Sequence, residues 1–430
     1  MRPFSFITLL LSLIISPVAE SRVDFDRFFA DSTLRVDYIM GAGPSSAPVI
    51  LLDGMSKSPV WAGRRHNLDS VPLAGNGTLT LTDAASGDTI YLHSFSTLFQ
   101  EWLSTDEVGQ TPRAFETVLL APLPKAETVI SVELRDAHHQ PIARMSHTYS
   151  PADVLVAVRG NKKPQTVTLN AASVGCDRAI DVAILGEGYT VAERDSFVTA
   201  ARRAATEILS YEPFARYRDR FNIVAVISDS DNSGVSVPRR GEWLDTSFGS
   251  HFSTFYSDRY LTTPRVKSVH DALDGVPYEH IIILANTDEY GGGGIYNSYT
   301  LTAARHEMMP PVVVHEFGHS FGGLGDEYFY EGDVMEDTYP TDIEPWEPNI
   351  TTLVDFDSKW RRLLPDGTPV PTPAERAAEF PIGVFEGGGY SAKGVYRPAD
   401  RCRMRDNHWP VFCPACQSWL ERLINFYISD

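Results

Sequence analysis

Three residues in the C-terminal half of the chain, His315, Glu316 and His319, have the types and spacing of a hydrolytic metal site. On a helix, two histidines four residues apart project from one face, as two ligands of a tetrahedral zinc ion must. Glu316 lies beside them and can act as a general base toward a metal-bound water. The motif therefore predicts a zinc site with Glu316 as the catalytic residue.

The segment after the second histidine is expected to supply a third ligand. A catalytic zinc ion takes three protein ligands and keeps one position open for water. Gly322 and Gly323 allow the helix to end, so that a later residue can turn back toward the metal. Asp326 is the predicted third ligand. Glu327 is the competing residue, and it could instead orient one of the ligands.

A second motif overlaps the first, because residues 318–322 match G-x-S-x-G, the nucleophile elbow of serine hydrolases. Asp400 and His408 follow Ser320 in the order that a triad of this class needs. The elbow requires a buried strand before its first glycine, where the polar residues of the first motif would have no evident partner. Zinc chemistry is therefore favoured. A serine hydrolase that uses Ser320 and a non-catalytic binding protein with structural zinc remain the alternatives.

Apolar runs predict the elements that must position the motif. Three runs are typical of buried strands: residues 180–185, 221–227 and 280–285. A helix from Thr190 to about Ser210, with Glu193 as capping-box partner, joins the first two strands. The glycines at 291–294 precede an irregular edge strand expected at 295–299. Pro311 and the apolar run 312–314 predict that the first motif is helical.

The first third of the chain predicts a separate β-sandwich over residues 22–155. Segments of alternating polar and apolar residues, separated by turn residues, are typical of such domains: 33–38, 77–82, 89–92 and 128–134. The polar stretch 159–164 is typical of a linker. The sequence thus predicts an α+β protein, in which the sandwich precedes a zinc peptidase domain over 165–430 with a mixed sheet and an active-site helix.

Composition and the N-terminus exclude other classes. Lys and Arg total 37 and Asp and Glu total 56, so the net charge is −19 and no nucleic-acid partner is expected. After the N-terminus, no run reaches the roughly 18 apolar residues of a membrane span. Arg2, the apolar segment 4–15 and the small residues Ala19 and Ser21 predict a signal peptide over 1–21, and hence a secreted or periplasmic protein.

Cysteines and acidic residues suggest further features. The cysteine count is even, which fits an oxidising compartment. Three of the four, Cys402, Cys413 and Cys416, are close in sequence, so at least one local disulfide is expected and its pairing stays open. A redox or zinc-ribbon motif at Cys413 is the alternative, although a second CxxC is missing. Residues 326–347 hold nine carboxylates, which predict a solvated loop, with a Ca²⁺ site as the alternative.

Several segments together resemble the IgA peptidase family of metallopeptidases, peptidase family M64. In the C-terminal half the resemblance is carried by residues 291–297, by HEFGHSFGGLGDEY at 315–328, and by 402–405 with 412–416. In the N-terminal half, residues 34–38, 95–102 and 113–116 are similar to the β domain of the same family. The likeness covers most of the chain after the signal segment.

The resemblance implies a metzincin-like catalytic domain that cleaves peptide bonds in extracellular proteins with the help of zinc. It also implies an edge strand that pairs with extended substrate, here Gly293, Gly294, Ile295 and Tyr296. A methionine turn beneath the metal is implied at Met404, and Tyr396 and His408 are nearby candidates for stabilising the tetrahedral intermediate. The usual metzincin spacing would place the third ligand at Gly325. Asp326 comes one residue later, so the ligand loop must be longer by one.

Overall fold

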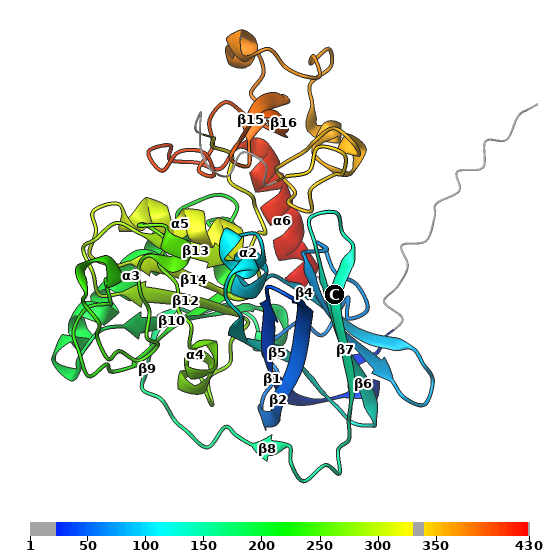
Figure 1. The fold of residues 1–430 in the computed structure, drawn as a ribbon, viewed down its shortest axis with the longest axis vertical. Coiled ribbons are helices and arrows are strands. Elements are labelled where there is room, and N and C mark those ends of the chain that lie inside the picture. Colours follow the sequence, from blue (N-terminus) through cyan, green and yellow to red (C-terminus); the bar gives the residue numbers. More distant parts are fainter. Residues whose placement is uncertain (1–22, 330–338, 429–430) are drawn as a thin grey trace, which may run out of the picture.

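The computed structural model describes residues 23–329 and 339–428. The fold is mixed α/β with several sheets (Figure 1). The expected signal peptide, residues 1–21, lies outside the described residues. None of the helices in the described ranges has the length and apolar character needed to cross a membrane.

The N-terminal part consists of two four-stranded sheets. One has the order β5-β1-β2-β8: β1 is Phe29–Gly43, β2 Ser46–Pro59, β5 Arg113–Pro124 and β8 Ala157–Val158. The other has the order β4-β3-β6-β7: β3 is Gly77–Asp83, β4 Thr89–Phe95, β6 Thr128–Arg135 and β7 Pro141–Tyr149. Every second residue of β3 is buried, as strand alternation predicts. Both sheets line one core, which holds Val36 of β1 and Leu81 of β3. Two short helices accompany them, α1 (Phe25–Phe28) and α2 (Leu98–Leu103).

A six-stranded mixed sheet follows, with the order β13-β14-β12-β10-β11-β9. Its strands are β9 (Thr166–Asn170), β10 (Ile180–Glu187), β11 (Phe221–Val226), β12 (His280–Ala285), β13 (Gly292–Ile295) and β14 (Tyr299–Ala303). The central strand β10 runs parallel to β11 and β12, and β12 runs parallel to β14. The outer strands β9 and β13 are antiparallel to their neighbours. Because β10 is buried along its whole length, the sheet must be covered on both faces.

Helices and loops cover the two faces of this sheet. One face packs against α3 (Arg194–Ile208), α5 (Met309–Ser320) and α6 (Pro414–Ile428), and the other against α4 (Val266–Ala272) and loops. The predicted capping box of Thr190 and Glu193 is present just before α3. A hairpin of β15 (Phe385–Gly388) and β16 (Ser391–Arg397) lies in the irregular C-terminal segment at the top of Figure 1. The indole of Trp419 on α6 donates to the carbonyl of Gly322, 2.7 Å away, at the end of α5.

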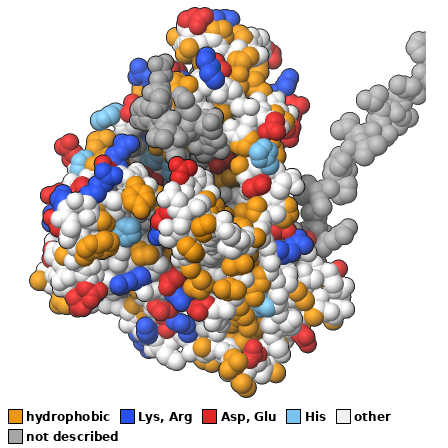
Figure 2. All heavy atoms as spheres, viewed as in Figure 1, with side chains coloured by type: hydrophobic (Ala, Val, Ile, Leu, Met, Phe, Trp, Pro, Cys, Tyr) orange, Lys and Arg blue, Asp and Glu red, His pale blue; other side chains and the backbone are white. Residues whose placement is uncertain are grey.

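The two halves of the chain are joined by polar contacts. Arg35 of β1 forms a 2.6 Å ion pair with Asp271 of α4, and the carboxylate of Glu116 accepts from the N–H of Lys267 at 2.8 Å. On the face shown in Figure 2, acidic and basic side chains are interspersed. The surface in view therefore has no basic stripe of the kind that follows a nucleic-acid backbone.

The edge strand begins at Gly292, three residues before the expected start at 295. The glycine-rich segment Gly292–Ile295 is itself the strand, and residues 296–298 form the turn of the hairpin, with Asn297 in the left-handed region at φ 48°. The expectation of a strand at 295–299 followed the β propensity of the larger residues. Packing decides otherwise, because a Cβ on Gly294 would lie 2.3 Å from the Glu316 carbonyl oxygen of α5. Only glycine lets the strand approach the helix this closely.

Candidate metal centre

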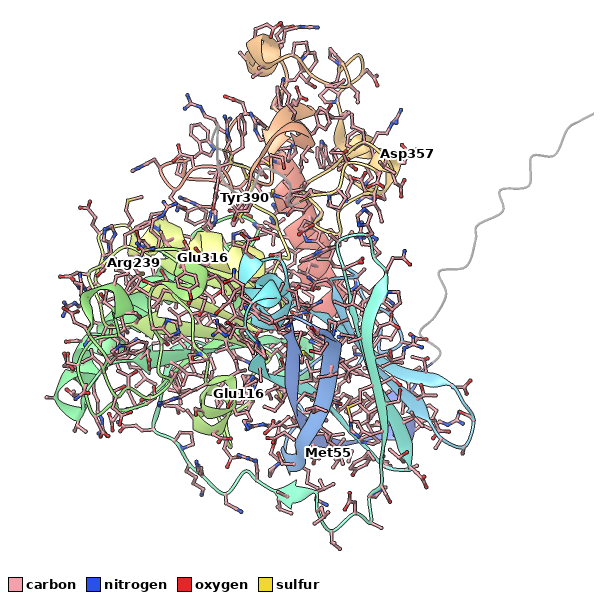
Figure 3. All side chains as sticks on the ribbon, viewed as in Figure 1. Met55, Glu116, Arg239, Glu316, Asp357 and Tyr390 are labelled. Atoms are coloured by element: carbon pink, nitrogen blue, oxygen red, sulfur yellow. The ribbon has the colours of Figure 1, made fainter. Side chains whose placement is uncertain are left out.

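The residues of the HExxH motif lie on α5, which begins with prolines in its first turn. His315 and His319 are one turn apart, and their Nε2 atoms are separated by 3.0 Å. His315 is buried and His319 is partly buried. Figure 3 shows Glu316 on the same helix, between the sheet and the C-terminal segment.

Backbone carbonyls fix the orientation of both imidazole rings. Nδ1 of His315 lies 3.0 Å from the carbonyl oxygen of Arg403, and Nδ1 of His319 lies 2.5 Å from that of Leu324. A carbonyl oxygen can only accept a hydrogen bond, so in each ring Nδ1 carries a proton and donates it. Nε2 of the neutral ring then keeps a lone pair, which is the form that binds a metal ion.

Asp326 completes a group of three acceptor atoms. Its Oδ1 lies 3.0 Å from Nε2 of His315 and 3.4 Å from Nε2 of His319. Three such atoms this close repel one another unless a proton or a metal ion lies among them. Ligands about 2.0–2.1 Å from a tetrahedral zinc ion would be about 3.3 Å apart, which matches the observed spacing. The structure therefore brings the three predicted ligands together in a donor set that fits zinc.

Burial and mutual charge perturb the ionisation of this group. Burial opposes ionisation of Asp326, but the neighbouring histidines outweigh it and hold the pKa of Asp326 well below its usual range. Burial lowers the pKa of His319, yet Asp326 and Glu316 outweigh it and raise that pKa to about 9. Burial raises the pKa of Glu316, with the two histidines opposing the change. The group as a whole attracts positive charge.

Met404, the expected methionine-turn residue, is fully buried against α5. A Cβ on Gly318 would lie 2.7 Å from its sulfur, so the thioether packs on the helix between the two histidine positions. The Met404 carbonyl also accepts from the N–H of Glu327 at 2.8 Å. This turn therefore contacts both the helix and the segment that carries Asp326.

Two tyrosines that no sequence motif indicates as site residues lie beside the three ligands. The Tyr390 hydroxyl donates to Oδ2 of Asp326, and the Tyr328 hydroxyl is 3.4 Å from that of Tyr390. The ring of Tyr328 stacks on that of His315, with centroids 6.5 Å apart. Figure 3 places Tyr390 in the C-terminal segment, above Glu316. Tyr390 is 64 residues from Asp326 in sequence, so no local spacing could have identified it.

The edge strand β13 passes directly beside α5. Its outer side is engaged at one end, where the N–H of Gly292 donates to the carbonyl of Arg259 at 3.4 Å. Peptide groups of an antiparallel strand alternate between its two sides, so those of Gly294 also face away from β14. Gly292 and Gly294 are partly exposed, whereas Gly293 and Ile295 are buried. Gly294 is thus the residue through which an extended peptide could pair with this edge.

The N-terminal half reaches the other end of this strand. Tyr296 is buried, its carbonyl accepts from the N–H of Ser96 at 2.9 Å, and its hydroxyl lies 3.3 Å from that of Ser94. The backbone carbonyl of Tyr296, a residue expected to pair with substrate, is therefore already engaged. Helix α2 brings Glu101 to Tyr260, whose hydroxyl donates to its carboxylate. Burial raises the pKa of Glu101 to about 7, although the hydrogen bond from Tyr260 opposes the shift.

Ser320, the alternative nucleophile, is the last residue of α5, and its hydroxyl lies 2.6 Å from that of Thr300. A nucleophile elbow places its serine at a strand-to-helix turn, so the end of a helix is the wrong position for one. Two other candidates, His408 and Tyr396, make no hydrogen bond to the three ligands among the described residues. His408 is exposed, and Tyr396 of β16 pairs through its backbone with Thr351.

The C-terminal cysteines form a second group with Glu327, and this corrects two expectations. Cys402, Cys413 and Cys416 are free and buried, and the sulfurs of Cys402 and Cys416 are 3.8 Å apart rather than the roughly 2.0 Å of a disulfide. The expected local disulfide is therefore not formed. Glu327 faces these sulfurs, with its Oε1 3.1 Å from Sγ of Cys416, and does not compete with Asp326 for the histidines.

The acidic stretch gives no support to the expected Ca²⁺ alternative. Within the described ranges two groups of side chains could hold a metal ion, and neither includes Asp342, Glu344 or Glu347. These three carboxylates have partners within the protein: His138, Lys359 and Tyr339, respectively. Residues 330–338 of the stretch lie outside the described part of the chain.

Comparison with known families gives two matches. The family described as IgA Peptidase M64 matches residues 168–380, and the one described as Peptidase M64 N-terminus matches residues 24–146. No curated protein matches the chain. The first match contains nearly all of the six-stranded sheet, α5 and all three residues of the metal centre, and the second contains most of the N-terminal sheets. The chain therefore belongs to the IgA peptidase M64 family, a family of metallopeptidases.

Proposed function

We propose that this protein is a secreted or periplasmic zinc metalloendopeptidase that cleaves proteins outside the cytoplasm. The observation that carries the proposal is the convergence of two imidazole nitrogens and one carboxylate oxygen, 3.0–3.4 Å apart, beside the edge strand β13. Three protein ligands leave one position of a tetrahedral zinc ion open, as catalysis requires. Secretion rests on the signal segment expected at residues 1–21.

Zinc bound by His315, His319 and Asp326 would lower the pKa of a coordinated water and polarise the scissile carbonyl. Glu316 then takes the proton of the attacking water and passes it to the leaving amine. Its raised pKa suits both tasks, because a carboxyl that ionises closer to neutral pH can accept and return a proton. Tyr390, beside the ligands, is a candidate donor to the developing oxyanion.

The substrate is proposed to lie extended along β13. Glu316 lies at this strand, since a Cβ on Gly292 would be 3.0 Å from its Oε1. A peptide hydrogen-bonded to the outward N–H and carbonyl of Gly294 would therefore have a backbone carbonyl close to the base. The pairing uses main-chain groups, so it selects an extended peptide rather than a particular side chain.

The proposal is tested with a peptide library, whose cleavage products are identified by mass spectrometry. Glu316→Gln should abolish cleavage, with a loss of at least about 10²-fold, while zinc remains bound. Ser320→Ala is the matched control on the same helix and should keep most of the activity, because its hydroxyl only contacts Thr300.

Two results would contradict this assignment. If Ser320→Ala abolishes cleavage and a chelator has no effect, the enzyme is a serine hydrolase. If the wild-type protein binds zinc and cleaves nothing in the library, the metal has a structural role in a binding protein. Metal content is measured by elemental analysis in each case.

A further inference from the structure

A second cluster of metal-binding side chains lies behind the first. Glu327, Cys402, Cys413 and Cys416 are each at most 2% exposed, and one donor atom from each lies within 4.8 Å of all the others. The four residues come from three separate places: the segment after α5, the methionine turn, and the start of α6. Three of them lie beyond residue 380, where the family match ends.

The spacing of the donor atoms suits a tetrahedral ion. Sulfurs about 2.3 Å from a zinc ion at tetrahedral angles are about 3.8 Å apart. The sulfurs of Cys402 and Cys416 are separated by 3.8 Å, and Sγ of Cys416 is 3.1 Å from Oε1 of Glu327. An ion at the centre would therefore require only small movements of these side chains.

A disulfide accounts for this cluster less well. Three sulfurs can form only one bridge, which would leave the third thiol and Glu327 in the interior. Oε2 of Glu327 is already buried without a hydrogen-bond partner. A buried, unpartnered carboxylate oxygen is costly, and a metal ion would relieve the cost. Oε1 is different, because it accepts from the Asn349 amide at 2.9 Å.

We infer that Glu327, Cys402, Cys413 and Cys416 bind a second, structural zinc ion. Thiolates select zinc among the common divalent ions, and four protein ligands close the coordination shell, which is typical of structural sites. The backbone N–H of Cys413 donates to Sγ of Cys402 at 3.2 Å and would help to hold a thiolate there.

The inferred ion would hold the catalytic ligands in position. Glu327 directly follows Asp326, and its N–H donates to the carbonyl of Met404. Cys402 directly precedes Arg403, whose carbonyl fixes the ring of His315. Loss of the second ion should therefore also weaken zinc binding by His315, His319 and Asp326, although the two sites share no ligand.

The test counts metal ions in the purified full-length protein. Wild type should hold zinc at both groups, two ions per chain. His319→Ala should keep the ion at the cysteines. Cys413→Ser should lose that ion and bind the other more weakly. Cys176→Ser, which removes the cysteine outside the cluster, is the matched control and should keep both.

Cobalt substitution gives an independent reading, because only a thiolate site shows sulfur-to-cobalt charge-transfer bands. These bands should persist in His319→Ala and be absent from Cys413→Ser. Alkylation of the unreduced, denatured protein in chelator should find four free thiols. A single zinc that is lost in His319→Ala and kept in Cys413→Ser, or two thiols missing as a disulfide, would overturn the inference. A single zinc that is kept in His319→Ala and lost in Cys413→Ser would instead refute the proposed catalytic site.

Discussion

The contact between β13 and α5 gives a sharp prediction for Gly294→Ala. The new methyl group would lie 2.3 Å from the carbonyl oxygen of Glu316 and 2.9 Å from Cβ of His319. Ordinary contacts begin at 3.4 Å, so strand and helix must separate by about 1 Å. The atoms in the way belong to the backbone and to a Cβ, which cannot swing aside as the end of a long side chain could.

The size of the effect follows from this displacement. Overpacking of this kind costs about 1–3 kcal/mol of unfolding free energy. A displacement of about 1 Å between a bound peptide and the catalytic base costs about 10²-fold in rate. All three zinc ligands lie on α5 or after it and can move together with the helix. We therefore expect kcat/KM to fall about 100-fold while the zinc content is unchanged.

The assay compares kcat/KM on the best library peptide, zinc content and thermal stability for two variants. Gly54→Ala in β2 is the matched control, because nothing lies within 4 Å of the added methyl group. It should behave as wild type in all three measurements. If Gly294→Ala keeps wild-type kcat/KM and stability, the close packing of strand on helix does not position the base.

Three further predictions concern single side chains. Asp326→Ala leaves two imidazoles and should lose the zinc held by the histidines on dialysis, whereas full retention by elemental analysis would refute Asp326 as ligand. Tyr390→Phe removes a hydrogen bond to Asp326 and should weaken zinc binding about 10–100-fold in a competition titration, and unchanged affinity would refute that role. Burial raises the pKa of Asp181 from 3.8 to about 6. The folded protein therefore holds this proton more tightly than the unfolded chain does, and the stability gained from this is complete below about pH 4 and lost as the pH rises through 6. Asp181→Asn should therefore stabilise the protein by about 3 kcal/mol at pH 8 and little at pH 4 in urea unfolding, and an equal effect at both would contradict this.

Local patterns predicted the central elements. The strand at 280–285 has the expected bounds, and the capping box of Thr190 and Glu193 is present, because both depend on neighbouring residues. The histidine pair was also visible, since helical spacing alone places both rings on one face. The family resemblance is confirmed by the two family matches.

Long-range contacts were not predictable in the same way. Tyr390 reaches Asp326 only because the turn of the β15–β16 hairpin folds back onto the segment that follows α5. The disulfide expectation used spacing and compartment, and neither shows that Glu327 turns toward the sulfurs. The glycine strand was missed because its formation depends on the helix packed against it, and glycine by itself disfavours strands.

The hydrogen bond from Ser96 to Tyr296 bears on how such proteins can evolve and be engineered. The two family matches cover residues 24–146 and 168–380 as separate segments. Ser96 of the first segment nevertheless donates a hydrogen bond to the turn that follows β13 in the second. The two segments should therefore be inherited and transplanted as a pair. A chimera that joins the catalytic segment to an N-terminal segment from a distant relative would have intact zinc ligands but a changed boundary for the bound peptide. Exchange of residues 94–103 alone, which include Ser96 and α2, is then a route to new cleavage preferences without any change at the metal.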